Sequence, residues 1–371
     1  MSRPRDTRPV RAEDAFDEAA VTAWLREHAV DSSGVEGIPE VHQFSGGASN
    51  LTFLLRYPPS GDRVGRDLIL RRAPRGTKAR GAHDMRREHT IQSALSATFP
   101  YVPGMVAFCD DATVLGGDFY VMDRIDGVIP RSEWPGDVPL PPDRARALCL
   151  AAVDVLAELH AVDPAEAGLE GLGRGAGYVR RQVEGWSTRY RNARTDDVPD
   201  LERVMAWLDR RQPDDVAACV IHNDFKLDNL VLDRADPTRV VGVLDWEMAT
   251  VGDPLMDLAG SMAYWVQADD PEDFQLMRRV PTHLPGMLTR DEVVSAYAER
   301  TGRTVTADQW RFYEVFGLFR LAVIAQQIYY RYVHGQTTNE AYAVFGPAVQ
   351  IVGRRLDGLV DPDGAGPVGD S

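Results

Sequence analysis

The spacing of hydrophobic and polar positions changes once along the chain. Up to about residue 125, short apolar stretches are separated by turn residues such as Gly and Pro, a pattern that predicts β-strands. From about residue 143 onward, apolar side chains mostly recur every three or four residues, which is typical of amphipathic helices. The pattern therefore predicts an α+β protein with an antiparallel, β-rich N-terminal lobe and a mainly helical C-terminal lobe.

The N-terminal lobe is expected to contain two helices besides its strands. One helix covers residues 12–30 and follows a mobile tail of residues 1–12, and the other covers residues 82–97. The expected strands cover residues 41–44, 51–57, 67–72, 105–109 and 119–122.

The C-terminal lobe is expected to consist of helices and one hairpin, formed by residues 229–233 and 240–244. A later helix begins at Pro254, with Asp253 as its N-cap. On that helix Asp257 either braces the loop before the hairpin or is a favourable first-turn charge. Other expected helices cover residues 143–161, 178–192 and 201–211, and a last one buries a face of Phe312, Phe316, Phe319, Val323 and Tyr330.

Three segments follow from this pattern. We place the N-terminal lobe at residues 1–125, the C-terminal lobe at residues 126–360, and a disordered tail rich in Gly, Pro and Asp at residues 361–371. Within the C-terminal lobe, the acidic run at residues 269–273 is interpreted as a solvated loop.

Composition restricts the class of protein. A net charge of −15 argues against nucleic acid as a partner, because phosphate backbones attract a basic surface. The chain has no uninterrupted apolar span of about 18 residues that would cross a membrane. Its three cysteines are scattered, so neither a disulfide framework nor a metal knuckle is indicated. We therefore expect a cytoplasmic protein that binds neither nucleic acid nor membrane.

One segment of the C-terminal lobe carries a dense set of polar residues at regular spacing. His222, Asp224, Lys226 and Asn229 lie within eight positions, and Asp245 ends the hairpin that follows. The spacing from Asp224 to Asn229 matches that of a kinase catalytic loop, in which the base Asp is followed five residues later by a metal-binding Asn. Turn capping alone would explain an isolated Asp and Asn, but it does not explain the whole set.

Phosphoryl transfer requires these residue types because negative charge spreads over the γ-phosphoryl oxygens in the transition state. Asp224 would take the proton of the acceptor hydroxyl, and Lys226 would reach the γ-phosphate as a point charge. Asn229 and Asp245 would supply hard oxygen ligands to Mg²⁺. A calcium loop is excluded because the twelfth position from Asp224 is Ala235.

A glycine-rich turn between the first two strands is a candidate phosphate-binding loop. Gly46 and Gly47 allow backbone amides to approach a phosphate closely, and Ser49 adds a hydroxyl donor. A hairpin that uses Gly-Gly only to turn is the alternative.

A cation on the third strand is expected to contact the nucleotide phosphates. Arg71 lies where kinases place a Lys that pairs with a helical Glu, and Glu88 on the next helix is the candidate partner. Arg72, which faces the other side of the strand, is the alternative. Because the guanidinium group of Arg is planar and carries several donors, the usual geometry of a Lys–Glu pair is not assumed.

The segment after the last strand is interpreted as a hinge between the lobes. The backbone of Asp123 to Ile125 would pair with adenine, and Met122 would border the nucleotide pocket.

With these segments in this order, the chain resembles the aminoglycoside phosphotransferase-like kinases over roughly residues 40–350. In the GGASNLTFLL and DWEMAT segments it is similar to the kinase-like region associated with acyl-CoA dehydrogenases. The resemblance implies a protein-kinase-like bilobal fold, ATP and Mg²⁺ as cofactors, and a small hydroxylated molecule as acceptor. It carries over Asp224 as base and Asn229 and Asp245 as metal ligands. Two departures are Asn223 in place of the usual Gly and Arg71 in place of Lys.

Two functions remain open at this point. The first is an ATP-dependent O-phosphotransferase acting on an aminoglycoside or on a metabolite such as a hydroxyacyl-CoA. The second is a nucleotide-binding pseudokinase that acts as an interaction module, for which Arg71 is the only support. The sequence distinguishes neither the acceptor, nor ATP from GTP, nor the oligomeric state.

Overall fold

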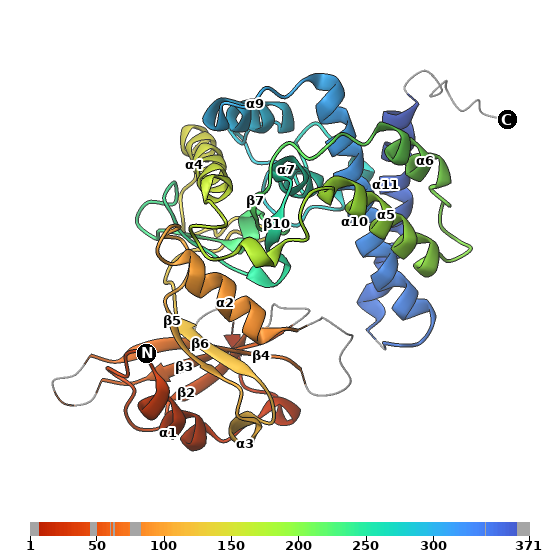
Figure 1. Cartoon of the computed structure of the whole chain (residues 1–371). Helices are drawn as coiled ribbons and strands as arrows, with labels where there is room; N and C mark the ends of the chain where they lie inside the picture. The colour runs from red at the N-terminus through yellow and green to blue at the C-terminus, as the bar shows by residue number, and fades with distance from the viewer. Residues whose placement is uncertain are drawn as a thin grey trace. The chain divides into compact units, whose positions relative to one another are not determined.

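The computed structural model of the chain describes residues 7–44, 50–59, 61, 64–74, 83–337 and 339–361. The chain divides into two compact units (Figure 1). The N-terminal unit consists of residues 1–126 together with 242–247, and the C-terminal unit consists of residues 127–241 together with 248–371.

The N-terminal unit is built on an antiparallel six-stranded sheet with the order β1-β2-β3-β4-β6-β5. The five expected strands are confirmed to within one residue at each end. β1 was missed because its two residues lie in the segment expected to be a mobile tail, where they pair with β2. The strands are β1 (Thr7–Arg8), β2 (Glu40–Phe44), β3 (Leu51–Tyr57), β4 (Arg66–Arg72), β5 (Met105–Cys109) and β6 (Phe119–Asp123).

The two faces of this sheet bury separate apolar clusters, because successive side chains of a strand point to opposite faces. In β4, Leu68 and Leu70 belong to one cluster, and Ile69 belongs to the other. Arg71 therefore follows Ile69 on one face, while Arg72 follows Leu70 on the other. This alternation separates the two arginines that the sequence left as alternatives.

Two helices and a short third one accompany the sheet. α1 (Glu18–His28) packs Val21 and Leu25 into the first cluster. The expected helix at residues 12–30 was wrong at its start, because Asp17 caps α1 through a bond from Ala20 N (2.9 Å) and residues 12–14 form a separate 3₁₀ turn, η1 (Ala12–Asp14). The other helices are α2 (Met85–Leu95), capped by Asp84, and the unexpected α3 (Ala112–Leu115).

The C-terminal unit is mainly helical, as expected. Short strands β7 (Cys219–Ile221) and β10 (Thr250–Gly252) form one two-stranded sheet, and β8 (Leu230–Leu232) and β9 (Val240–Val243) form another. The helices are α4 (Pro142–Ala161), α5 (Tyr178–Ala193), α6 (Glu202–Arg211), α7 (Pro254–Ala263), α8 (Glu272–Gln275), α9 (Arg290–Thr301), α10 (Ala307–Val333) and α11 (Phe345–Val360). Among the described residues, the chain contains no helix that combines the length and the apolar character needed to cross a membrane.

The long helix α10 supplies much of the core of this unit. Its expected apolar face is buried at Phe312, Phe316, Phe319 and Val323, whereas Tyr330 is only partly buried and stacks on His334 (3.9 Å between ring centroids). α10 approaches α7 closely at Gly317, where a Cβ atom would lie 2.3 Å from the carbonyl oxygen of Ala259. This crossing therefore requires glycine.

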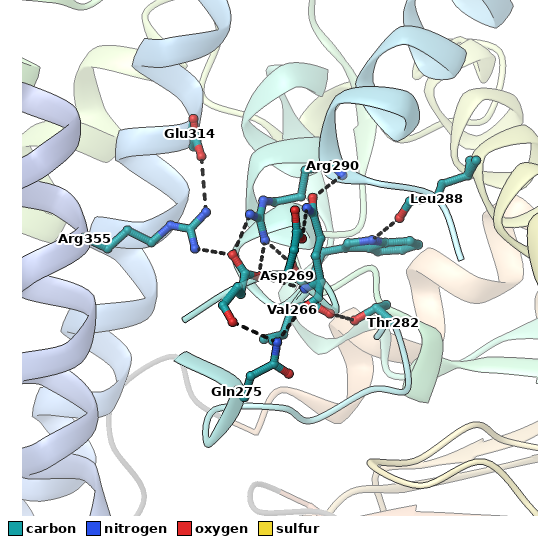
Figure 2. Close-up of polar contacts among 11 residues, drawn as sticks. Val266, Asp269, Gln275, Thr282, Leu288, Arg290, Glu314 and Arg355 are labelled. Carbon is teal, nitrogen blue, oxygen red and sulfur yellow. Dashed lines mark hydrogen bonds and ion pairs between the residues drawn. The ribbon is translucent and has the colours of Figure 1, made fainter. Parts of the chain in front are cut away.

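The expectation of a solvated acidic loop at residues 269–273 holds for the exposed Asp269 and Pro271, but it was wrong for Asp270. The side chain of Asp270 is only 4% exposed, and it accepts two hydrogen bonds from Arg290 (2.6 and 2.8 Å) and one from Arg355 (2.8 Å) (Figure 2). The last two residues of the run, Glu272 and Asp273, begin α8. A single carboxylate thus joins the segment after α7 to the start of α9 and to α11.

This network predicts a specific loss of stability in acid. Burial opposes ionisation, but hydrogen bonds from Arg290 and Arg355 lower the pKa of Asp270 to about 2. Its folded pKa lies below its unfolded value, so its contribution to stability is present above about pH 4 and is lost as the pH falls toward 2. In urea unfolding, Asp270→Asn should be about 2 kcal/mol less stable than the wild type at pH 7, and this difference should shrink toward pH 2.

Asp269→Asn is the matched control, because Asp269 is the exposed neighbour of Asp270. It should change the unfolding free energy by less than roughly 0.5 kcal/mol at pH 7. A wild-type-to-Asp270→Asn difference that stays constant between pH 7 and pH 2 would contradict the prediction.

Candidate active site

A catalytic-loop candidate leaves β7 with a sharp change of backbone direction. Asn223 has φ of 63°, in the left-handed region that favours Gly and that Asn also tolerates. Asn can therefore occupy this position, at which the resemblance described above implies Gly. The two amides at the turn, His222 N and Asn223 N, donate to the two carboxylate oxygens of Asp257 on α7 (2.7 Å each). The expectation that Asp257 braces this loop is confirmed.

Asp257 is itself held by a buried hydrogen-bond network. His160 Nε2 on α4 lies 3.1 Å from its carboxylate, and His160 Nδ1 lies 2.6 Å from the hydroxyl of Tyr297 on α9. Burial opposes ionisation of Asp257, but the bond from His160 and the charge of its ring lower the pKa of the carboxyl below its ordinary value. The carboxylate therefore remains charged at neutral pH and fixes the loop to three helices.

Within this loop the predicted base is held by two neighbours. Lys226 Nζ lies 2.5 Å from Asp224 Oδ2, and Asn229 Nδ2 donates to the same oxygen (2.9 Å) and to the carbonyl of Asp224 (2.8 Å). Because Asn229 uses its amino group for both bonds, its amide oxygen is the atom suited to a cation. The structure thus brings Asp224, Lys226 and Asn229 together, as the spacing predicted.

Lys226 carries its charge in a largely buried environment. Burial opposes that charge, but Asp224 and Asp228 raise the pKa of Lys226 above its ordinary value. The same burial raises the pKa of Asp228, whose carboxylate lies 3.6 Å from Lys226 Nζ. A permanent cation therefore accompanies Asp224 at neutral pH.

His222 is fully buried, and its Nδ1 accepts a hydrogen bond from the backbone amide of Asp224 (3.2 Å). This burial favours a positioning role over contact with a bound ligand.

In the N-terminal unit, Arg71 forms the expected ion pair with Glu88 (3.2 Å) and a second one with Asp245 (3.0 Å). Arg72 points to the other face, where it donates to the carbonyl of Asp14 (2.8 Å) and lies over the ring of Phe53. The structure therefore assigns the pairing with Glu88 and Asp245 to Arg71.

In this group Arg71 and Glu88 are buried, whereas Asp245 is partly exposed. Burial raises the pKa of Glu88 to about 7, although Arg71 opposes the rise. Burial also disfavours the charge of Arg71, but Tyr120, Glu88 and Asp245 raise the pKa of the guanidinium above its ordinary value. Arg71 thus favours the charged form of Glu88, which its burial disfavours.

The backbone around Asp245 is firmly fixed. Asp245 has φ of 67°, and the next residue, Trp246, is fully buried and donates to the carbonyl of Val243 (2.9 Å). Arg87 donates to the carbonyl of Glu247 (3.0 Å), and Asn50 donates to its side chain (3.1 Å). This arrangement orients the predicted metal ligand through its chain neighbours.

Asn50 and Glu247 were missed by the sequence reasoning. Asn50 directly follows Ser49 in the sequence, and its side-chain oxygen Oδ1 also lies 2.8 Å from His83 Nδ1. Its contact with Glu247 spans 197 positions, so only the place of each residue beside a predicted motif could have drawn attention to it.

The remaining predicted nucleotide contacts are placed as follows. Gly46, Gly47 and Ser49 lie outside the described residues. Met122 on β6 is buried in the second apolar cluster of the sheet. Asp123 ends the strand, with its amide donating to Gly104 O (2.8 Å) and its carboxylate paired with Arg66 (2.8 Å), and Ile125 packs against Gly242.

The two residues predicted to bind Mg²⁺ carry donor atoms of the type that this cation accepts. The predicted ligands are a carboxylate, Asp245, in the N-terminal unit and an amide oxygen, Asn229, in the C-terminal unit. Both are hard oxygen donors, and Mg²⁺ usually binds one or two such side chains together with phosphates and water. Over the described ranges, no cluster of three or more His, Cys, Asp and Glu side chains forms an all-protein metal site.

A family model described as "Phosphotransferase enzyme family" matches residues 40–292. Acyl-CoA dehydrogenase family member 11 of Homo sapiens is 35% identical over 351 residues, covering 93% of this chain and 43% of that protein. Acyl-CoA dehydrogenase family member 10 of Mus musculus is 34% identical over 340 residues, covering 90% of this chain and 30% of that protein. The chain spans less than half the length of these curated relatives.

Solved structures agree with the fold. A Ralstonia eutropha protein assigned to the aminoglycoside phosphotransferases superposes with a TM-score of 0.78 at 30% identity, covering 94% of this chain and 99% of that one. A choline kinase from Cryptosporidium parvum (TM-score 0.59, 10% identity, 92% and 98% covered) and a macrolide 2′-phosphotransferase type I (0.54, 20%, 91% and 98%) share the fold alone. The expected kinase-like α+β fold is confirmed.

Proposed function

Because the chain belongs to the phosphotransferase enzyme family, we propose that it transfers the γ-phosphoryl group of ATP to a hydroxyl group of a small molecule. The observation that carries this proposal is the loop in which Asp224 is held between Lys226 and Asn229 and anchored on Asp257. A carboxylate fixed in this way suits a general base, because it loses little freedom on meeting its substrate.

In the proposed reaction the oxygen of the acceptor hydroxyl forms a bond to the γ-phosphorus, and Asp224 accepts the proton that this hydroxyl loses. The bond from that phosphorus to the bridging oxygen breaks, which yields ADP and a phosphomonoester. Lys226 would contact the transferred group, and Arg71 would contact the phosphates nearer the ribose. Asn229 and Asp245 would hold Mg²⁺, which neutralises phosphate charge when it is bound.

An active enzyme is favoured over a pseudokinase. The only sequence support for a pseudokinase was Arg71 in place of Lys. Arg71 nevertheless makes the ion pair with Glu88 that the kinase pattern requires of that position, at 3.2 Å. The exchange of Lys for Arg thus preserves the charge pairing.

Two acceptor classes are supported by different relatives. The names of the acyl-CoA dehydrogenase relatives favour a hydroxylated acyl compound such as a hydroxyacyl-CoA. The Ralstonia eutropha structure, assigned to the aminoglycoside phosphotransferases, favours an aminoglycoside.

A screen for acceptor-dependent ADP release tests the proposal. Purified protein with Mg²⁺ and ATP, or GTP in parallel, is offered hydroxylated metabolites, hydroxyacyl-CoA thioesters and aminoglycosides, and products are checked by ³¹P NMR for a phosphomonoester. We expect at least one acceptor to increase ADP release well above the rate with water alone. Calorimetric binding of Mg·ATP with no transfer to any acceptor would instead favour the nucleotide-binding module.

A further inference from the structure

Asn223, directly before the predicted base, forms hydrogen bonds through both its backbone and its side chain. Its amide donates to Asp257 on α7 (2.7 Å), and its carbonyl accepts from Arg320 Nη2 on α10 (2.6 Å). A Gly at this position would keep both of these backbone bonds. The side chain adds two bonds that Gly cannot make, because the hydroxyl of Tyr178 donates to Oδ1 (3.3 Å) and Nδ2 donates to the carbonyl of Met248 (3.1 Å).

The peptide bond between Asn223 and Asp224 is held at both of its polar atoms. Arg320 binds the carbonyl oxygen, and the ring of His222 accepts from the amide, which belongs to Asp224 (3.2 Å). Arg320 is only 7% exposed, and a Cβ atom at Gly260 of α7 would lie 2.9 Å from its Nη1, so Gly at that position leaves room for the guanidinium. Because the peptide group is planar, fixing it restricts the direction in which the side chain of Asp224 leaves the backbone.

Tyr178 is a fixed anchor for the side chain of Asn223. It is the first residue of α5, and its amide and that of Val179 donate to the carboxylate of Asp215 (2.8 Å each). Its ring is buried, and a Cβ atom at Gly252 of β10 would lie 2.8 Å from it. Burial raises the pKa of Tyr178 to about 12, so the hydroxyl keeps its proton at neutral pH and can donate to Asn223.

The backbone conformation of Asn223 shows what its side chain adds. Its φ of 63° lies in the left-handed region, which Gly adopts without strain and Asn adopts at some cost. Gly would relieve that strain, but it would also give the loop more conformational freedom and remove two hydrogen bonds. Asn at this position therefore restricts the loop that carries Asp224.

We propose that Asn223 is a positioning residue for the predicted base. Its side chain, through Tyr178 and Met248, restricts the catalytic loop (residues 222–229) and keeps the carboxylate of Asp224 directed toward the acceptor hydroxyl. This inference rests on the proposed function for the role of Asp224. The backbone and side-chain polar groups of Asn223 are all engaged within the protein, so it acts through Asp224 and not by contact with a ligand.

Hydrogen exchange tests this anchoring without any chemistry. Asn223→Gly should fold, because Gly favours a φ of 63°. It should raise the exchange rate of the loop amides about tenfold, as expected when about two hydrogen bonds are lost, and leave exchange in α11 unchanged. Mass spectrometry of peptides from the exchanged protein measures both. Loop exchange equal to that of the wild type would overturn the inference.

Turnover tests the consequence for the base. In Asn223→Gly, kcat for phosphoryl transfer should fall about tenfold, with the KM for Mg·ATP unchanged. The urea midpoint of unfolding should change little, because relief of backbone strain offsets the lost bonds. A residue with only a structural role would lower that midpoint and leave the kcat of the folded enzyme unaltered. That result would contradict a positioning role.

Tyr178→Phe covers the case in which Asn223→Gly does not fold. It removes only the hydroxyl, so it should lower kcat about threefold and raise loop exchange by a similar factor. The double variant should be no slower than Asn223→Gly alone, because the bond between the two residues is already absent. Loop exchange unchanged in Tyr178→Phe, or single effects that multiply in the double variant, would show that this bond does not hold the loop.

Tyr329→Phe is the matched control for Tyr178→Phe. It also removes a hydroxyl that forms a hydrogen bond, here with Asp197 at the surface of the same unit (2.6 Å). It should leave both kcat and loop exchange as in the wild type.

The two measurements separate this inference from the proposed function. If the wild type turns over and Asn223→Gly keeps its kcat, the positioning role is overturned and the phosphotransferase proposal stands. If Asn223→Gly increases loop exchange but the wild type transfers phosphate to no acceptor, the phosphotransferase proposal fails, and the positioning of a base fails with it.

Discussion

Asp224→Asn is expected to lower kcat for phosphoryl transfer by a factor of about 10²–10⁴. The amide keeps the shape of the carboxylate and can still accept hydrogen bonds from Lys226 and Asn229, but it cannot take the proton of the acceptor. The KM for Mg·ATP should change little, because the loss falls on the reacting proton. Steady-state ADP release, with the KM for each substrate measured separately, checks this expectation.

Asp214→Asn is the control for Asp224→Asn, because Asp214 is an exposed aspartate of the same unit. It should keep wild-type kinetics. If Asp224→Asn retained more than about a tenth of the wild-type kcat, proton removal by Asp224 would no longer account for the reaction. A rise in the KM for Mg·ATP with unchanged kcat would show that Asp224 acts in binding the nucleotide and not in removing the proton.

Arg71→Met is expected to show the second large effect, on stability and on nucleotide binding together. Loss of the guanidinium leaves Glu88 and Asp245 without the cation that lies 3.2 and 3.0 Å from them. Removing one partner from a buried ion pair costs about 3–5 kcal/mol, because the other partner stays buried. Urea unfolding should show this loss, and the KM for Mg·ATP should rise.

Arg72→Met separates the two effects. Arg72 is also buried, yet it contacts Asp14 and Phe53 on the other face of the sheet. Its loss should destabilise the protein without raising the KM for Mg·ATP, when activity is measured well below the unfolding temperature. Equal changes in that KM for both variants would show that stability alone, and not contact with the nucleotide, is responsible.

The sequence predicted best those features that depend on neighbours in the chain. The strands of the N-terminal sheet follow from apolar runs bounded by turn residues. The contacts of Asp224 with Lys226 and Asn229 follow from spacing, since all three lie in one short loop. The bracing of that loop by Asp257 was one of two alternatives that the sequence left open, and the contacts with His222 N and Asn223 N decide for it.

Contacts between distant segments could not be read from spacing. The bond of Arg71 to Asp245 spans 174 positions, and that of Asp270 to Arg355 spans 85. The acidic run at residues 269–273 was predicted to be solvated because no basic residue lies within it. The arginines that pair with Asp270 lie on α9 and α11, further along the sequence. Register and tertiary packing, not composition, determine such pairs.

The predicted start of the first helix was wrong for a local reason. The apolar spacing of residues 12–30 is helical throughout, but it does not show that Asp17 serves as a cap. A carboxylate at an N-cap satisfies free backbone amides, so the helix begins there although periodicity alone continues across it.

Residues 242–247 belong to the N-terminal unit although the residues on both sides of them belong to the C-terminal unit. Neither unit is therefore encoded by one uninterrupted stretch of the gene. A fragment cut after Asp126 would contain the whole six-stranded sheet and Arg71, yet it would lack Asp245 and the fully buried Trp246. Evolution or engineering can thus exchange such a module only by moving two separate pieces of coding sequence together.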